Sequence, residues 1–314
     1  MSGKSKRVGL DIFELMDMFP NEEVATEWFE NIFWAGGRVC GHCGSERTVE
    51  RKNRKPLPYR CKDCRKDFSV RHGTVMQHSK IPLRKWAVAI YQLTTGLKGT
   101  SSRKLHRDIK VSYACTWHLS HRIREAWTQY VGVKFDGENE VDETYIGGKE
   151  ANKHNSKKLK LGRGVVGKTA VTGVKNRRTK QVRAKVVERT DSATLQGFVE
   201  DNVEQGATVY TDEATAYQGM VDFEHKSVKH SVGEFVKGMA STNGIESFWA
   251  MLKRGYMGTY HKMSAKHLAR YVNEFVGRHN IRDLDTIEQM ICVTRLMKGK
   301  QLQYKELIAP PVSP

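Results

Sequence analysis

The sequence predicts a multidomain α+β protein, in which a small cysteine-bearing module and short helices precede a mixed β-sheet flanked by helices. Three observations support this prediction. Two CxxC pairs stand near the N-terminus, three segments with helical spacing follow them, and β-rich runs begin near residue 137. A chain of 314 residues is long enough to build several such domains.

Composition and charge narrow the class of protein. Against 35 acidic residues stand 53 Lys and Arg, a formal net charge of +18 that attracts polyanions. Nucleic acid is therefore the expected partner, and a basic surface that is merely solvated is the alternative. No run approaches the roughly 18 apolar residues of a membrane-spanning helix, and the first residues lack the apolar core of a secretory signal. We expect a cytoplasmic protein without a membrane partner.

Four cysteines form a metal-ligand pattern. Two CxxC pairs, with seventeen residues between them, predict a zinc ribbon that holds one structural Zn²⁺ through four thiolates. A segment this small lacks a core of its own, and a tetrahedral ion would close its two hairpins. Disulfides are disfavoured without a signal peptide, and a redox site needs one pair, not two. The predicted ligands are Cys40, Cys43, Cys61 and Cys64.

Helical segments flank the ribbon. The acidic run LDIFELMDMFPNEEVATEWFENIFW predicts a packing helix with Asn21 as its N-cap, and we do not expect it to contact DNA. After the ribbon, IPLRKWAVAIYQLTTGLKG, TSSRKLHRDI and SYACTWHLSHRIREAWTQY predict three short helices, which resemble a helix-turn-helix element. A plain three-helix bundle is the alternative.

The third of these helices is the candidate for reading DNA. Its spacing leaves His121, Arg122 and Arg124 on the outer face, where Arg122 and Arg124 would contact DNA. The residues predicted to face the core are Tyr113, Trp117, Leu119 and Ile123.

The periodicity then changes to that of a sheet. The runs NEVDETYIGG, VVGKTAVTGVK, KQVRAKVVER and GATVYTD predict strands, SATLQGFVEDNV predicts a helix before the fourth strand, and HKSVKH is a weaker fifth strand. The order β-β-β-α-β predicts a mixed sheet with helices packed on it, the arrangement of a ribonuclease-H-like core.

Basic residues concentrate inside this region. Between Lys149 and Arg189 fourteen Lys or Arg stand against two acids. Part of the stretch, KEANKHNSKKLKLGRG, has no apolar periodicity and predicts a loop. The loop residues expected to contact DNA are Lys157, Lys158, Lys160 and Arg163.

Three carboxylates stand where phosphoryl transfer would need them. Asp142 lies inside the first strand and Asp212 ends the fourth, while Glu246 lies on a later helix. If these elements are neighbours, the three side chains converge and would hold two Mg²⁺ or Mn²⁺ ions for cleavage of a phosphodiester. Glu143 and Glu213 are adjacent acidic alternatives, and a cap or turn is the ordinary role of a strand-end Asp.

The helix that carries Glu246 is amphipathic. Glu246 and Lys253 project within about 20° of each other at the border of its apolar face, roughly 10 Å apart along the axis. At that separation they do not form an ion pair, and we expect Lys253 to bind a phosphate beside the metals. The apolar stripe consists of Ile245, Phe248, Trp249 and Leu252.

Together these motifs resemble a known family. VDETYIGG, YTDEATAY and TNGIESFWAMLKRGYMGTYHKMSAKHLARYVNEFVGRHN, preceded by the zinc ribbon, are similar to the bacterial insertion-sequence DDE transposases related to eukaryotic Merlin elements (ISXO-type). The resemblance covers nearly the whole chain. Sixty-nine residues separate the two aspartates and thirty-three separate Asp212 from Glu246, as in the wider DDE superfamily.

The resemblance implies an activity and its partners. It implies a DNA transposase that binds terminal inverted repeats, cleaves DNA with Mg²⁺ and joins the 3′-hydroxyl ends to target DNA, as a homo-oligomer in a synaptic complex at the bacterial nucleoid. Members of the family differ at the third acidic position, so Asn243 is the alternative to Glu246. A catalytically idle DNA-binding regulator and a ribonuclease-H-like nuclease or resolvase are the other functions that the sequence allows.

The predicted organisation has five segments. They are an N-terminal helical segment (1–36), a zinc ribbon (37–80), a helix-turn-helix-like segment (81–131), a ribonuclease-H-like catalytic domain (132–283) and a C-terminal helical tail (284–314).

Overall fold

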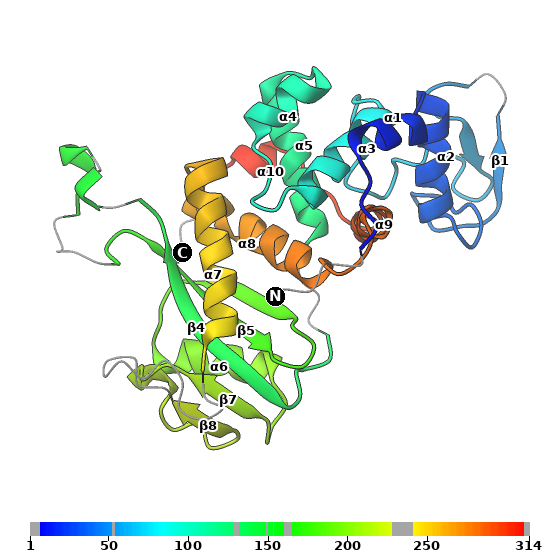
Figure 1. Cartoon of the computed structure of the whole chain (residues 1–314). Helices are drawn as coiled ribbons and strands as arrows, with labels where there is room; N and C mark the ends of the chain where they lie inside the picture. The colour runs from blue at the N-terminus through cyan, green and yellow to red at the C-terminus, as the bar shows by residue number, and fades with distance from the viewer. Residues whose placement is uncertain are drawn as a thin grey trace. The chain divides into compact units, whose positions relative to one another are not determined.

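The computed structural model (Figure 1) divides the chain into two compact units. One unit joins Met1–Thr128 to Ile281–Pro314, and the other is Gln129–Asn280. The C-terminal segment therefore packs with the N-terminal part of the sequence. Among the described residues, no helix is both long and apolar enough to cross a membrane. The structure describes residues 7–51, 54–128, 132–148, 150–152, 154–159, 165–227 and 241–310.

The first unit begins with two helices where the sequence predicted one. α1 (Ile12–Met18) and α2 (Glu22–Phe33) are separated at Pro20. Proline lacks an amide hydrogen and disfavours helical geometry in the residue before it, so the helix ends there. Asn21 is the N-cap of α2, as predicted, and its side chain accepts a 2.9 Å hydrogen bond from the amide of Val24.

The zinc-ribbon region is a three-stranded antiparallel sheet. β2 (Tyr59–Cys61) pairs with both β1 (Thr48–Glu50) and β3 (Asp67–Phe68). Its small core contains Tyr59 and Phe68, which pack edge-on against Trp34. A core with so few apolar side chains gives the hairpins little stability of their own, so we expect a cross-link through the cysteines to stabilise them.

Helices complete the first unit. α3 (Leu83–Thr95), α4 (Ser102–Ile109) and α5 (Tyr113–Ala126) pack against one another, and α9 (Thr286–Leu296) packs on α2, α3 and α5. α10 (Tyr304–Ile308) follows near the C-terminus. The largest fully buried side chains of this unit include Phe19, Phe29, Met76, Trp86 and Ile90.

The second unit is built on a five-stranded mixed sheet. The first three strands form an antiparallel meander, while the last two run parallel to the first. The spatial order β6-β5-β4-β7-β8 confirms the ribonuclease-H-like arrangement, including the weak fifth strand up to Ser227. The strands are β4 (Glu138–Ile146), β5 (Thr169–Asn176), β6 (Val182–Val187), β7 (Thr208–Thr211) and β8 (Glu224–Ser227).

Helices cover both faces of this sheet (Figure 1). α6 (Ser192–Asn202) shares one core with Val141 and Val174, whereas α7 (Asn243–Gly255) and α8 (Ala265–Asn280) share the other with Val171 and Val182. Because side chains alternate between the faces of a strand, each residue of β4 belongs to either the α6 face or the α7 face.

Candidate functional site

The four cysteines of the ribbon meet at one point. Their sulfur atoms all lie within 4.8 Å of one another, and the pairs Cys40–Cys64 and Cys43–Cys61 are 3.7 Å apart. A disulfide needs about 2.05 Å, whereas a tetrahedral zinc with bonds of about 2.3 Å sets sulfurs about 3.8 Å apart. Backbone amides, first that of Cys64, lower the pKa of Cys61 to about 6, whereas burial raises the pKa of Cys40 to about 12, so the fit rests on the geometry. The donor set and its spacing fit zinc.

The second site begins with the alternation of β4. Glu143 faces α6 together with Val141, and its Oε2 accepts a 2.8 Å hydrogen bond from the hydroxyl of Tyr217. Asp142 therefore lies on the α7 face. The two adjacent acids of the sequence are separated by the sheet, and Asp142 is the one on the side of Glu246.

Asp212 reaches the same edge from β7. β4 and β7 are parallel, with Glu140 opposite Tyr210, so two further residues bring Asp142 level with Asp212. β7 ends at Thr211, and the Oδ1 of Asp212 accepts a 3.1 Å hydrogen bond from the amide of Ala214, which fixes the side chain in a tight turn. The position at the carboxyl end of neighbouring parallel strands is typical of binding sites.

α7 brings the third carboxylate to this edge. Its apolar stripe is buried as predicted, and Trp249 lies over Gly173, where an added Cβ would stand 2.7 Å from the indole ring. Gly173 pairs directly with Asp142, so the glycine lets the helix approach the sheet at the site itself. Glu246 and Lys253 are exposed at the border of the stripe, and so is Asn243.

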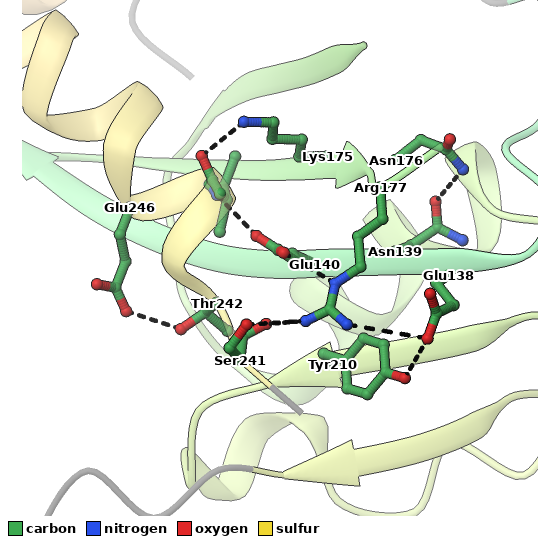
Figure 2. Close-up of polar contacts among 12 residues, drawn as sticks. Glu138, Asn139, Glu140, Lys175, Asn176, Arg177, Tyr210, Ser241, Thr242 and Glu246 are labelled. Carbon is green, nitrogen blue, oxygen red and sulfur yellow. Dashed lines mark hydrogen bonds and ion pairs between the residues drawn. The ribbon is translucent and has the colours of Figure 1, made fainter. Parts of the chain in front are cut away.

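The hydroxyl of Thr242 orients the carboxylate of Glu246. Its Oγ1 donates a 2.7 Å hydrogen bond to Oε1 of Glu246 (Figure 2). Thr242 is the N-cap of α7 but makes no capping bond with its side chain. The threonine therefore supports the acid and not the helix end.

The three carboxylates act on one another electrostatically. Burial, and then the negative charges of Glu143, Asp212 and Glu246 in that order of effect, together raise the pKa of Asp142 to about 7. Within the part of the chain that the structure describes, the cysteines are the set drawn together closely enough to hold a metal ion as they stand, and the three carboxylates are not. A divalent cation would relieve this repulsion, and carboxylate oxygens are the ligands Mg²⁺ prefers.

A polar network that sequence reasoning missed surrounds the start of α7 (Figure 2). Glu140 of β4 and Arg177, just after β5, connect the sheet to Ser241 and Ile245. The signal in the sequence was the alternation of β4, which places Glu140 on the same face as Asp142. Its partners lie far away along the chain and could not be found from local patterns.

The predicted exposure of the α5 arginines is wrong. Arg124 is 1% exposed and His121 is fully buried, while Tyr113, expected in the core, is 46% exposed. Arg122 donates to the carbonyl oxygens of Leu302 and Gln77, because the C-terminal segment folds back over this half of α5. These arginines serve the packing of the first unit, and the exposed part of α5 is its N-terminal turn.

The basic loop is described only in part. Short 3-10 turns occur at Glu150–Asn152 and Asn155–Lys157, and Lys158 is half-buried. The side chain of Lys157, and all of Lys160 and Arg163, lie outside the described residues.

Comparison with known proteins identifies two domains in the chain. Residues 20–67 match a model of the transposase zinc-ribbon domain, and residues 134–280 match a model of the ISXO2-like transposase domain. Over 275 residues the chain is 28% identical to "Uncharacterized protein in transposable element ISH50" of Halobacterium salinarum (strain ATCC 700922 / JCM 11081 / NRC-1). That alignment covers 84% of this chain and 92% of the relative.

A solved structure is also similar, at a lower level. A chain of the simian T-cell lymphotropic virus intasome in complex with PP2A regulatory subunit B56 gamma is 12% identical. It aligns with 55% of this chain and 67% of its own, at a TM-score of 0.29, too low to support a shared fold. The two family models confirm the insertion-sequence resemblance: the chain carries an ISXO2-like transposase domain at residues 134–280, preceded by a transposase zinc-ribbon domain at residues 20–67.

Proposed function

We propose that this protein is a transposase, which binds the terminal inverted repeats of an insertion sequence, cleaves the DNA at their ends and joins the freed 3′-hydroxyls to target DNA. The observation that carries the proposal is the convergence of Asp142, Asp212 and Glu246, from two parallel strands and a helix, at one edge of the sheet. A regulator that only binds DNA would not need this costly collection of repelling charges. Such an enzyme acts on DNA in the cytoplasm.

The three carboxylates are the proposed Mg²⁺ ligands. When bound there, two Mg²⁺ ions supply activation of the attacking oxygen and stabilisation of the leaving oxygen. The chain's own part is to hold the ligands on rigid elements, with Asp212 fixed by the amide of Ala214 and Glu246 by the hydroxyl of Thr242. Lys253, exposed on the same edge of α7, would bind a phosphate of the DNA backbone.

The proposed chemistry has two steps of the same kind. In cleavage, the oxygen of water attacks the phosphorus, the P–O3′ bond breaks and a free 3′-hydroxyl remains. In joining, that 3′-oxygen attacks a phosphodiester of the target, whose own 3′-oxygen leaves with a proton. A homo-oligomer would hold two ends together so that both joins occur at one target site.

The DNA contact is proposed on the corner between α4 and α5. Three residues join these helices, with Lys110 in the left-handed conformation at φ 48°, and the first turn of α5 is exposed. In a helix-turn-helix the N-terminal residues of the second helix contact bases. Arg103 stacks over the ring of Tyr113, with its guanidinium carbon 5.3 Å from the ring centroid. The exposed cations of α4 and of the turn that follows it are Arg103, Lys104, Arg107 and Lys110.

Zinc is proposed to hold the ribbon that precedes this corner. One Zn²⁺ on the four thiolates would supply the cross-link that the small core of the ribbon lacks.

Incubation of the purified protein with a labelled duplex of the element's end, with and without Mg²⁺, tests the function. Metal-dependent cleavage followed by joining to a second duplex is expected. Cleavage without joining would favour a nuclease or resolvase, and binding without cleavage under Mg²⁺ or Mn²⁺ would leave a DNA-binding regulator.

A further inference from the structure

We infer that Glu140 and Arg177 are positioning residues, which fix the first turn of α7 on the sheet and thereby place Glu246 beside Asp142. The inference rests on the proposed function, because it concerns the geometry of the proposed metal site. It assigns a role to Glu140, an acid of β4 that lies on the same face as Asp142 but takes no part in holding metal.

Both oxygens of Glu140 are already occupied. Oε1 accepts a 2.9 Å hydrogen bond from Nε of Arg177, and Oε2 accepts a 2.9 Å hydrogen bond from the amide of Ile245 (Figure 2). The side chain of Glu140 is 7% exposed and that of Arg177 15%. A buried carboxylate with both oxygens engaged is a structural anchor, in contrast to Asp142 two residues later.

Glu140 supplies the cap that α7 does not supply for itself. The first amides of a helix have no partner within the helix, and a side-chain oxygen of the N-cap residue usually accepts one of them. Thr242 makes no such bond, since its hydroxyl donates to Glu246. The amide of Ile245 is capped from the neighbouring strand instead, which ties the helix end directly to β4.

Arg177 and Lys175 extend this attachment to residues that precede Ile245. The Nη2 atom of Arg177 donates to the carbonyl oxygen of Ser241 at 2.7 Å and to its hydroxyl at 3.0 Å, and Nζ of Lys175 donates to the carbonyl oxygen of Gly244 at 2.9 Å. Tyr210 lies under the guanidinium, whose central carbon is 4.0 Å from the ring centroid. Ser241, Gly244 and Ile245, all within five residues before Glu246, are thus held by β4, by β5 and by the residue that follows β5.

Gly244 permits this close contact. A Cβ at this position would lie 2.5 Å from Oε2 of Glu140 and 3.1 Å from its Oε1 and Cδ atoms. These atoms are buried and hydrogen-bonded, so they cannot swing away freely. Alanine is the better helix former of the two residues. Helix propensity alone would therefore predict that Gly244→Ala orders the start of α7. The close contact with Glu140 predicts instead that the added methyl group displaces the start of α7 from the sheet.

The test combines metal binding with amide exchange in the whole chain. Glu140→Gln, Arg177→Lys and Gly244→Ala are compared with Asp136→Asn, which removes an exposed ion pair to Arg178 that does not touch α7. We expect the three variants to weaken Mn²⁺ binding, measured by electron paramagnetic resonance, by about 10- to 100-fold. In metal-free protein their amides at Ile245 and Glu246 should exchange faster, while those in the middle of α8 stay as in the wild type and Asp136→Asn changes neither readout.

Wild-type exchange and wild-type Mn²⁺ affinity in Gly244→Ala and Arg177→Lys would overturn the inference. Faster exchange with unchanged Mn²⁺ affinity would overturn it too, because the contacts would then support the fold without placing the ligand. Should Glu140→Gln fail to fold, the other two variants decide. Wild-type protein that binds no Mn²⁺ would contradict the proposed function, and the exchange measurement would still decide whether Glu140 and Arg177 fix the helix.

Discussion

Asp142 of β4 and Asp212 at the end of β7 lie side by side, although sixty-nine residues separate them in the sequence. Their strands are parallel neighbours, and the negative charge of Asp212 contributes to the raised pKa of Asp142. Two carboxylates held this way repel each other unless a proton or a metal ion intervenes. This competition between proton and metal makes the site testable through pH.

Metal affinity should depend on pH around neutrality. Asp142 has a pKa of about 7, against an ordinary value of 3.8, so below pH 7 a metal must displace its proton. The apparent affinity for Mg²⁺, measured by calorimetric titration, should rise between about pH 6 and about pH 8 and then level off. Asp142→Asn should bind Mg²⁺ more weakly and lose this dependence. A wild-type affinity that is flat across the range would contradict the assignment.

The raised pKa of Asp142 also predicts how the stability of the metal-free protein depends on pH. A carboxyl whose pKa is raised by folding contributes stability below its unfolded pKa of 3.8, and that contribution is lost as pH rises through about 7. At pH 8 without Mg²⁺, Asp142→Asn should therefore raise the Tm by a few °C, since 1 kcal/mol corresponds to about 2–4 °C at this size. Thermal unfolding at pH 5 is the control, where the difference between the proteins should shrink.

The ribbon should contain zinc. Elemental analysis of the purified protein should find one Zn²⁺ per chain, and replacing both Cys40 and Cys61 by Ser should remove it and unfold the ribbon. Cys115→Ser is the matched control, because Cys115 is exposed and lies outside the cluster. Well-folded wild-type protein without zinc would end this prediction.

The corner between α4 and α5 should set DNA affinity. Arg103→Ala, Arg107→Ala and Lys110→Ala should each weaken binding and lower the dependence of log K on log salt by about 1, as expected for one lost phosphate contact. Arg122→Ala should leave that dependence unchanged, because its guanidinium binds the carbonyls of Gln77 and Leu302. The reverse pattern in a fluorescence-anisotropy titration would place the DNA on the other end of α5.

The third metal ligand should be Glu246, with Asn243 dispensable. Asn243→Ala is expected to change cleavage of an end duplex little, and Lys253→Ala to reduce it moderately, since it removes a phosphate contact and leaves the ligands in place. Severe loss in Asn243→Ala together with a tolerant Glu246→Gln would transfer the role to Asn243.

Local patterns predicted the elements of this protein well. The order of strands, the N-cap at Asn21, the buried stripe of α7 and the cysteine cluster all follow from spacing that is visible within about twenty residues. Strand alternation also places Asp142 and Glu143 on opposite faces of β4.

Contacts between distant segments were beyond such patterns. Arg122 and Arg124 were expected on the outer face of α5, but Arg122 contacts the carbonyl oxygens of Gln77 and Leu302 and Arg124 is 1% exposed. Glu140 likewise looks like any acid on a strand until Arg177 and Ile245 engage both of its oxygens. Helical periodicity identifies an apolar face but not which polar face a later segment will bury.

The most direct test of the central claim compares wild-type protein with Asp142→Asn, Asp212→Asn and Glu246→Gln on one labelled end duplex. Each change removes an anionic ligand at nearly constant shape, so DNA affinity should stay within about threefold while Mg²⁺-dependent cleavage falls by at least about 1,000-fold. Mn²⁺, which accepts looser geometry, should restore part of the activity. Three variants that cut the duplex at the wild-type rate would contradict the proposed metal site.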